Sequence, residues 1–368
     1  MKFTCPQQTL SKALNVVSKA ITNRTTIPIL KGILLEADHG QLTLTASDLE
    51  LSIETKIDVQ IAEEGSLVVS AKLFSDIIRK LPSGMVEVEE KENNMIVIRC
   101  MSSEFTIVGQ SADEFPSTGD VEETNSIQLE KELFKDLVRK TAFAASLDES
   151  KGIILGVLID IGAEMIQMVA LDGYRMAITR EHVRSDETRK IIIAARILNE
   201  VNKVIMDSDS EADMRIVLDQ KKAMFLTGDT KIVVRMLEGQ FIDFKNVLPK
   251  SHQTRVKISR SELLESIERA SLLARDGKNN LIRIAVGDTS MTVTSRSEEG
   301  NVKEEITIAR EGDGLEIGFN SKYLLDVLKV ISDDEVYMEF NSSVSPCMVK
   351  PVEGDAYEYL TLPVRISN

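Results

Sequence analysis

Leu171-Asp172-Gly173-Tyr174-Arg175-Met176-Ala177 is the stretch that decides the fold, and it directly follows a strand-like segment, residues 165–170. The same alternation of apolar residues precedes Asp48, about 124 residues before Asp172, and Ser297, about 125 residues after it. An internal period of this length indicates repeated domains, because each copy is long enough to bury a core of its own.

Each copy contains two segments with the periodicity of an amphipathic helix. The six candidate helices are residues 9–20, 72–80, 130–142, 195–206, 261–273 and 322–330. Between them apolar residues recur with a period of two, which is typical of strands with one buried face. The sequence therefore predicts an α+β fold of three repeated domains, 1–125, 126–252 and 253–368, each formed by two βαβββ halves with two helices on antiparallel sheets.

The composition is that of a soluble globular protein, with 43% hydrophobic and 28% charged residues among 368. No apolar run is long enough to span a membrane, and the N-terminus lacks the features of a secretory signal. The three cysteines are scattered and lack CxxC spacing, so we expect reduced thiols that fill space. Together these features predict a cytoplasmic protein with no membrane partner.

The net charge of -15 argues against a surface that binds nucleic acid over its whole area. The candidate helices nevertheless carry more basic than acidic residues, so the rest of the chain is even more acidic. Basic helices on an acidic body fit a protein in which only the helical face meets phosphate. The alternative is that Lys and Arg are simply good helix formers on solvated faces.

No enzyme site can be assembled from the sequence. His39, His182 and His252 lack metal-ligand spacing, and no phosphate-binding glycine motif occurs. Residues 207–213 are acidic like a calcium loop, but the loop lacks the glycine at its sixth position and has Leu218 at its twelfth. We therefore predict no catalytic residue, no metal ligand and no cofactor.

Seven motifs carry a family resemblance. They are Met1-Lys2-Phe3-Thr4, Pro28-Ile29-Leu30, Ser47-Asp48-Leu49-Glu50, Asp172-Gly173-Tyr174-Arg175-Met176-Ala177, Gly239-Gln240-Phe241-Ile242-Asp243 with Val247-Leu248-Pro249, Gly318-Phe319-Asn320 and Tyr359-Leu360-Thr361-Leu362-Pro363-Val364-Arg365. Through them the chain resembles the bacterial DNA polymerase III beta subunits, the sliding clamps, over essentially its full length.

The resemblance implies a non-enzymatic protein whose DNA-clamp domains form a head-to-tail homodimeric ring around double-stranded DNA. It implies helices that line the central hole without reading sequence, and continuous sheets that form the outside. The implied function is to tether the replicative DNA polymerase catalytic subunit for processive replication. The other implied partners are the clamp loader and clients that carry a Gln/Leu/Phe-type clamp-binding peptide.

The resemblance also implies three sets of site residues. The DNA-binding set is Arg24, Lys72 and Lys151, and the dimer-interface set is Phe105, Ile107, Leu272 and Leu273. The client-peptide pocket is implied at Ile154, Leu171, Gly173, Tyr174, Arg175, Met176, Val247, Tyr323, Val344, Leu360, Leu362, Pro363, Val364 and Arg365, with Arg175 and Arg365 near its rim. The chain departs from the family at Ile242, where proline is common, and at Ser367-Asn368, which extend past the usual end.

Two other functions stay open at this point. One is a purely structural repeat or scaffold protein, which would retain neither circular DNA nor client peptides. The other is an enzyme with an atypical acidic metal site, which would lose its activity when one carboxylate is replaced.

Overall fold

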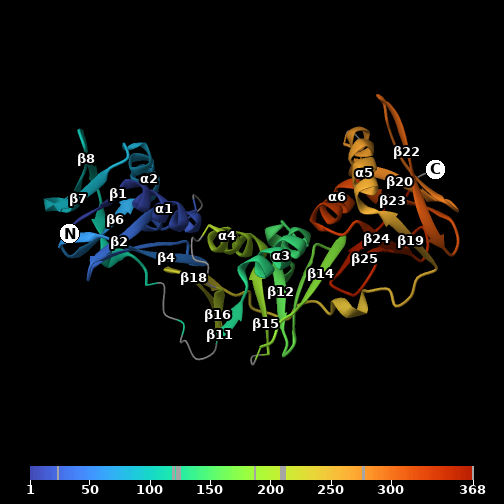
Figure 1. Cartoon of the computed structure of the whole chain (residues 1–368), viewed down its shortest axis with the longest axis horizontal. Coiled ribbons are helices and arrows are strands. Elements are labelled where there is room, and N and C mark those ends of the chain that lie inside the picture. The colour runs from blue at the N-terminus through green and yellow to red at the C-terminus, as the bar shows by residue number, and fades with distance from the viewer. Residues whose placement is uncertain are drawn as a thin grey trace. The chain divides into compact units, whose positions relative to one another are not determined.

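The computed structural model describes residues 1–22, 25–117, 121, 126–185, 188–207, 213–275 and 278–366. Strands and short helices follow the predicted order of six successive βαβββ halves (Figure 1). The α+β prediction of three repeats, each with two helices, is therefore confirmed. No helix among the described residues is both long and apolar enough to cross a membrane.

The first repeat has two such halves. Its first half consists of β1 (Lys2–Pro6), α1 (Gln7–Val17), β2 (Gly32–Asp38), β3 (Gln41–Ser47) and β4 (Leu51–Asp58). Its second half consists of β6 (Gly65–Ser70), α2 (Ala71–Lys80), β7 (Met85–Lys91), β8 (Met95–Cys100) and β9 (Ser103–Val108). The short strands β5 (Gln60–Glu63) and β10 (Gln110–Ser111) accompany them.

The second repeat follows the same order. Its elements are β11 (Ser126–Leu129), α3 (Lys131–Thr141), β12 (Gly156–Ile161), β13 (Met165–Leu171) and β14 (Arg175–His182), then β15 (Arg189–Ala194), α4 (Ala195–Met206), β16 (Met214–Leu218), β17 (Lys222–Thr227) and β18 (Thr230–Arg235). A 3-10 segment, η6 (Glu149–Leu155), precedes β12.

The third repeat completes the chain. Its elements are β19 (Thr254–Ser259), α5 (Arg260–Ala274), β20 (Leu281–Val286), β21 (Ser290–Ser297) and β22 (Gly300–Glu311), then β23 (Leu315–Asn320), α6 (Ser321–Val330), β24 (Glu335–Phe340), β25 (Cys347–Pro351) and β26 (Tyr357–Thr361). Helix α5 extends one residue beyond each end of the predicted helix, residues 261–273. It begins earlier because the Ser259 hydroxyl oxygen caps it by accepting the Glu262 N–H.

Strand pairing does not stop where one repeat passes into the next. A nine-stranded sheet has the order β10-β6-β2-β3-β4-β18-β17-β16-β11, and a twelve-stranded sheet has the order β15-β12-β13-β14-β26-β25-β24-β19-β22-β21-β20-β23. The third sheet has the order β5-β1-β7-β8-β9. The second repeat therefore gives its strands to two different sheets.

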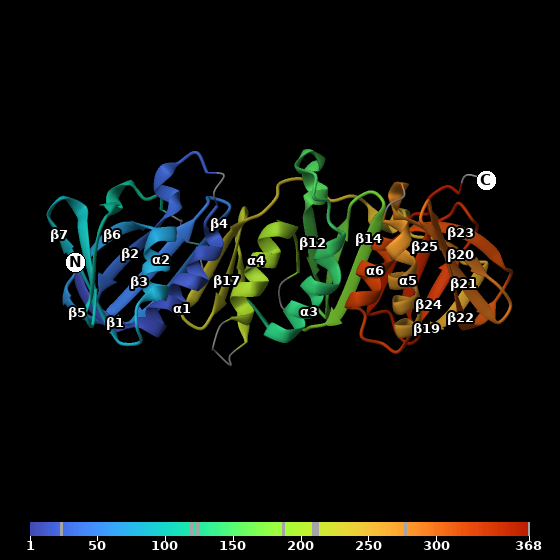
Figure 2. The same ribbon diagram turned by 90° about the horizontal axis from the view of Figure 1, so that it is seen from above.

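The chain accordingly divides into two compact units. Unit 1 comprises Met1–Phe134 with Arg196–Met236, and unit 2 comprises Lys135–Ala195 with Leu237–Asn368. In unit 1, α1 and α2 pack against each other and against strands of the nine-stranded sheet (Figure 2). In unit 2, α5 and α6 pack together in the same way, and α5 covers β20, β21 and β22.

The helices form where the apolar periodicity predicts because one face of each is buried. Leu10, Leu14 and Val17 of α1 are at most 1% exposed, and Phe74 and Ile78 of α2 are fully buried. All three cysteines are buried free thiols. Burial raises the pKa of the Cys5 thiol to about 12, which keeps it protonated and unreactive at neutral pH.

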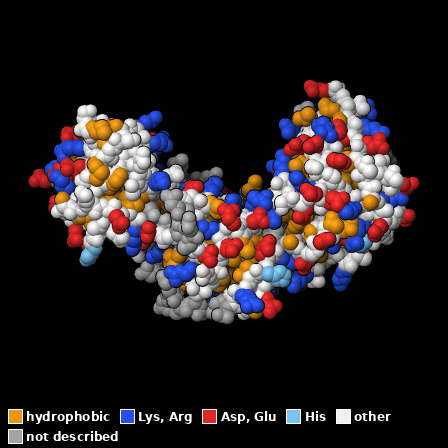
Figure 3. Space-filling model, in the orientation of Figure 1, with side chains coloured by type: hydrophobic (Ala, Val, Ile, Leu, Met, Phe, Trp, Pro, Cys, Tyr) orange, Lys and Arg blue, Asp and Glu red, His pale blue; other side chains and the backbone are white. Residues whose placement is uncertain are grey.

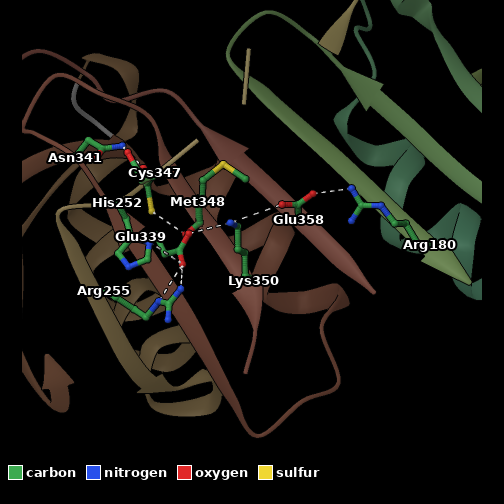
Figure 4. Close-up of polar contacts among 10 residues, drawn as sticks. Arg180, His252, Arg255, Glu339, Asn341, Cys347, Met348, Lys350 and Glu358 are labelled. Carbon is green, nitrogen blue, oxygen red and sulfur yellow. Dashed lines mark hydrogen bonds and ion pairs between the residues drawn. The ribbon is translucent and has the colours of Figure 1, made fainter. Parts of the chain in front are cut away.

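A row of alternating charges crosses five neighbouring strands of unit 2, from β14 to β19 (Figure 4). Arg180 pairs with Glu358 at 2.6 Å, and Lys350 bridges Glu358 (3.7 Å) and Glu339 (2.9 Å). Arg255 pairs with Glu339 at 2.7 Å. Glu339 is only 5% exposed, so its charge depends on these partners.

Burial alone would raise the pKa of Glu339, but hydrogen bonds from Lys350 and Arg255 outweigh it and hold the pKa below its usual value. A carboxylate whose folded pKa is depressed stabilises the fold at any pH above its unfolded pKa, roughly 4.3. That stabilisation is lost as the pH falls through the folded pKa.

We expect Glu339→Gln to lower the free energy of unfolding by about 3 kcal/mol at pH 7, because two partly buried cations, Lys350 and Arg255, lose their counter-charge. The difference from the wild type should shrink as the pH falls below the unfolded pKa and through the depressed folded pKa of Glu339. Urea unfolding at several pH values measures both effects. The control is Glu335→Gln, which removes a half-exposed partner of Lys257 and should change little; a pH-independent loss for Glu339→Gln would contradict the account.

Candidate functional site

The stretch of residues 171–177 contains a tight turn between β13 and β14. Asp172 Oδ1 accepts hydrogen bonds from the backbone N–H groups of Tyr174 (2.8 Å) and Arg175 (3.0 Å). Gly173 occupies a left-handed conformation with φ of 93°, which glycine adopts without strain. The turn therefore presents Tyr174 at the end of β14, where its ring is 61% exposed.

The first repeat contains the same turn. Asp48 Oδ1 accepts hydrogen bonds from the N–H groups of Glu50 (3.0 Å) and Leu51 (2.7 Å). Leu49 takes the place of Gly173 and has φ of 74°, a conformation that is costly for a residue with a Cβ. The repeat seen in the sequence thus extends to individual hydrogen bonds.

Beside the second turn, β14 pairs with β26, so that Met176 lies opposite Leu360. An apolar cluster forms around this pair, which we name the β14–β26 cluster. Its buried members are Leu158, Val169, Leu171, Met176, Ile178, Ile192, Phe244, Met348 and Leu360, and its partly buried members are Ile153, Ile154, Leu237, Phe241, Leu248 and Leu362. The structure therefore brings together five of the predicted pocket residues: Ile154, Leu171, Met176, Leu360 and Leu362.

Sequence reasoning missed several members of this cluster, including Ile178, Phe244 and Met348. Ile178 follows Met176 by two positions, so strand alternation on β14 could have identified it. Met348 lies opposite Leu360 in the pairing of β25 with β26. No local signal in the sequence predicts that pairing.

Unit 2 also has exposed apolar residues that are not members of the β14–β26 cluster. Val247 is 49% exposed, Val344 is 73% exposed and Ile242 is 42% exposed. The rings of Tyr174 and Tyr323 stack with their centroids 6.3 Å apart and an interplanar angle of 21°. Exposed apolar and aromatic groups of this kind are typical of surfaces that bind a partner.

Arg175 does not lie at a rim, where we expected it. Its side chain is only 10% exposed and is held by Asp172 Oδ2 at 3.1 Å and Asp326 Oδ2 at 2.5 Å. Its Nη2 donates to the Phe143 carbonyl oxygen at 2.8 Å, and its guanidinium stacks on the Tyr323 ring, 4.8 Å from the centroid. Arg175 therefore connects the turn to α6 and orients Tyr323.

The C-terminal residues of the predicted pocket leave β26 and reach β23. The Leu362 N–H donates to the Tyr174 carbonyl oxygen at 2.8 Å, and the Val364 N–H donates to the Gly318 carbonyl oxygen at 2.8 Å. Pro363 is partly buried and Arg365 is exposed. The extension Ser367-Asn368 lies outside the described residues.

The matching junction in unit 1 has an ion pair beside its turn. There β4 pairs with β18, and the Glu50 carbonyl oxygen accepts the Arg235 N–H just as Tyr174 accepts that of Leu362. Arg196 pairs with Glu50 at 2.9 Å and lies 3.7 Å from Asp48. The same backbone arrangement thus presents Glu50, paired with Arg196, where unit 2 presents Tyr174.

The predicted DNA-binding residues fall in different elements. Lys72 is exposed in the first turn of α2, and Lys151 is exposed in η6. Arg24 lies outside the described residues. In the part of the surface visible in Figure 3, acidic and basic side chains are interspersed, so the net negative charge is not gathered into one patch there.

The predicted interface residues lie at one sheet edge and on α5. Strand β9 is the last strand of the five-stranded sheet, and Phe105 is 41% exposed there. Ile107 is only 8% exposed, whereas Val108, which sequence reasoning did not single out, is 68% exposed. Leu272 is 61% exposed on α5, and Leu273 is half-buried.

Within the described ranges, one group of side chains could hold a metal ion. The ligand atoms of Asp38, His39 and Glu64 lie within 4.8 Å of one another, and all three residues are exposed. A hydrogen bond from His39 to Asp38, together with the charge of that carboxylate, raises the pKa of His39. A metal ion that binds His39 must therefore displace a proton from its imidazole, and the Asp38 carboxylate stabilises that proton. The acidic loop 207–213 lies largely outside the described residues.

Comparison with known proteins gives the family. Models of the DNA polymerase III beta subunit match its N-terminal domain at residues 1–119, its central domain at 128–243 and its C-terminal domain at 245–365. A beta sliding clamp of Staphylococcus epidermidis is 35% identical over 376 aligned residues, covering 99% of each chain.

Solved structures agree with this result. The DNA polymerase sliding clamp from Bacillus subtilis has a TM-score of 0.96 and 33% identity, covering 100% of each chain. The beta subunit from the DNA polymerase of Streptococcus pyogenes has a TM-score of 0.94 and 29% identity, again covering 100% of each chain. The fold is thus that of a three-domain clamp, and the chain belongs to the DNA polymerase III beta subunit family. The resemblance seen in the sequence is confirmed.

Leu49 offers a test of the repeated turn. Glycine relieves the left-handed strain, whereas alanine keeps the Cβ that causes it, so Leu49→Gly should be more stable than Leu49→Ala by about 1 kcal/mol. The two variants lose the same half-exposed side chain, so each controls for the other. Urea unfolding measures the difference, and equal stability would contradict a strained turn at this position.

Proposed function

We propose that this protein is a sliding clamp that holds a DNA polymerase on duplex DNA. Two copies close head to tail into a ring around the double helix. The protein contributes tethering rather than chemistry, and its partners are DNA, a second copy of itself, the replicative polymerase, the clamp loader and other clients. Membership of the DNA polymerase III beta subunit family supports this function over a scaffold or a metal enzyme.

The observation that carries the client-binding part of the proposal is the β14–β26 cluster. Its buried side chains belong to the same unit as Tyr174, Val247 and Val344, which are exposed, and Tyr323 stacks on Tyr174. The equivalent junction in unit 1 has Glu50 and Arg196 instead. A client peptide with apolar anchors therefore meets exposed apolar groups at one junction and an exposed ion pair at the other.

The expected affinity follows from the size of the anchors. A leucine and an aromatic side chain each contribute roughly 1.5–3 kcal/mol when buried, and ordering the peptide offsets part of that gain. A micromolar dissociation constant, about -8 kcal/mol, is the result we expect. Such an affinity lets clients exchange on one ring.

The proposed ring closes at β9 of one copy, with Phe105, Ile107 and the exposed Val108. That edge meets Leu272 and Leu273 on α5 of the second copy. An unpaired edge strand invites association, and a two-fold pair of such contacts leaves no edge open.

The proposed DNA contacts are Lys72, Lys151 and Arg24. The domain limits at 125/126 and 252/253 stay predictions.

Leu272→Ala combined with Leu273→Ala should raise the dimer dissociation constant at least tenfold, because both side chains lose their apolar contact area. Native mass spectrometry at micromolar concentration measures the dimer fraction. Leu264→Ala, on the same helix, is the matched control and should stay dimeric. If the wild type is monomeric under these conditions, the ring is wrong.

Tyr174→Ala should weaken binding of a Gln-Leu-Ser-Leu-Phe peptide at least tenfold, because one exposed aromatic wall is removed while the buried cluster stays intact. Calorimetry measures the affinity, and the dimer mass should not change. The control is Glu50→Ala, at the equivalent place in unit 1, which should bind as tightly as the wild type. Equal loss in both variants would refute the assignment of the peptide to the β14–β26 cluster.

A further inference from the structure

The guanidinium group of Arg175 is held by three acceptors and two aromatic rings. Its Nε donates to Asp172 Oδ2, its Nη1 to Asp326 Oδ2 and its Nη2 to the Phe143 carbonyl oxygen. The ring centroid of Phe143 lies 5.3 Å from the guanidinium carbon and that of Tyr323 lies 4.8 Å from it. With its donors bound in this way, the group supports its neighbours rather than reaching out to a ligand.

Of the two carboxylates that bind Arg175, Asp326 comes from the other side of the junction. Asp172 belongs to the turn itself, and its Oδ1 is already engaged by the turn's N–H groups. Asp326 lies on α6, three residues after Tyr323, so both side chains project from one face of that helix. Arg175 contacts both of them, and the ion pair with Asp326, at 2.5 Å, ties the guanidinium to α6.

The position of this guanidinium bears directly on an exposed aromatic pair. Tyr323 contacts Arg175 by its ring and also stacks on the ring of Tyr174, with centroids 6.3 Å apart. A cation–π contact is favourable only while the cation stays over the ring, so a fixed guanidinium favours one orientation of Tyr323. The contacts therefore run in one series, from Asp326 through Arg175 and Tyr323 to Tyr174.

The equivalent turn in unit 1 shows that the fold does not require this arrangement. There Asp48 Oδ1 binds the N–H of Leu51. Leu51 takes the place of Arg175 and is a fully buried apolar residue. The turn therefore forms equally well without a guanidinium behind it.

The counterpart of Asp326 also has a different partner. Helix α4 is the second helix of its repeat, as α6 is of the third, and the buried Leu198 aligns with the buried Leu324. Glu200 then corresponds to Asp326. Glu200 forms an ion pair with Lys203 of its own helix at 2.8 Å. A carboxylate at this helix position is thus directed to a turn only where that turn presents an exposed tyrosine.

We propose that Asp326 is a positioning residue for client peptides. It fixes the guanidinium of Arg175, and Arg175 in turn holds the Tyr323 ring that supports Tyr174. Asp326 acts through these side chains and not by touching the peptide. This inference rests on the proposed function, since the peptide site belongs to that function. A preformed aromatic pair spares the peptide the cost of ordering it, so the loss of Asp326 should appear as lost affinity.

Five variants of the full-length protein test this role. Asp326→Asn removes the charge and keeps the shape, whereas Asp326→Glu keeps the charge. Arg175→Gln removes the group through which Asp326 acts, alone and combined with Asp326→Asn. The matched control is Lys329→Gln, which breaks an ion pair of the same helix with Glu268.

Two readouts address the peptide site and two address the fold. Calorimetry with a Gln-Leu-Ser-Leu-Phe peptide gives the affinity. Near-ultraviolet circular dichroism reports how the tyrosines are packed, because the chain has five tyrosines and no tryptophan. Thermal unfolding and dimer mass show whether the variants stay folded and assembled.

Asp326→Asn should weaken peptide binding about fivefold and change the tyrosine dichroism, whereas Asp326→Glu should stay within about twofold of the wild type. Arg175→Gln should weaken binding at least about tenfold. The double variant should bind like Arg175→Gln alone, because Asp326 then has no group to act through. Lys329→Gln should match the wild type. A merely structural carboxylate would instead lower the melting temperature and leave both the affinity and the tyrosine dichroism unchanged.

Unchanged affinity and dichroism in Asp326→Asn would overturn the proposal. Losses that multiply in the double variant would overturn it as well, since Asp326 would then act independently of Arg175. An equal loss in Lys329→Gln would do the same, because the charge of α6 would matter and not the position of one carboxylate. In these cases peptide binding by the wild type leaves the clamp function standing. A wild type that does not bind the peptide would refute that function, while the dichroism of Asp326→Asn would still show whether Asp326 positions the tyrosines.

Discussion

The rest of the structure depends on backbone hydrogen bonding between strands of neighbouring repeats. Strand β4 pairs with β18, and β14 pairs with β26. At the first junction Thr55 and Thr230 also join their hydroxyls at 2.9 Å in a buried contact. Because these pairs extend each sheet across two repeats, the second repeat is shared between two compact units. Through the pairing with β26, the apolar side chains of β14 gain Leu360 as a partner in addition to those of β13.

One turn therefore serves different purposes in different repeats. The Asp172 turn presents Tyr174 beside an apolar cluster, whereas the Asp48 turn presents Glu50 to Arg196. Since the backbone repeats and the side chains diverge, function in this chain is assigned by residue substitution on a common frame.

The sequence was sufficient to predict the threefold repeat, the six helices and the βαβββ order, because all of these follow from local periodicity. The continuous sheets were expected only from the family resemblance, since strand pairing over more than a hundred residues leaves no local signal. Arg175 illustrates the limit. Its inward position depends on Asp326, 151 residues away, and on the ring of Tyr323. Met348 joined the β14–β26 cluster for the same reason, through the long-range register of β25 with β26.

The central claim, that the protein encircles DNA, is a claim about topology. If only about three to five phosphates are contacted at once, a complex with linear duplex falls apart as salt rises, with a slope near -0.9 per contact. A closed ring on circular DNA cannot leave without opening an interface. The direct measurement is retention of loaded protein on a nicked circular plasmid at high salt, before and after the plasmid is linearised. The account predicts retention on the circle and release on linearisation, and equal salt sensitivity on both forms would contradict it.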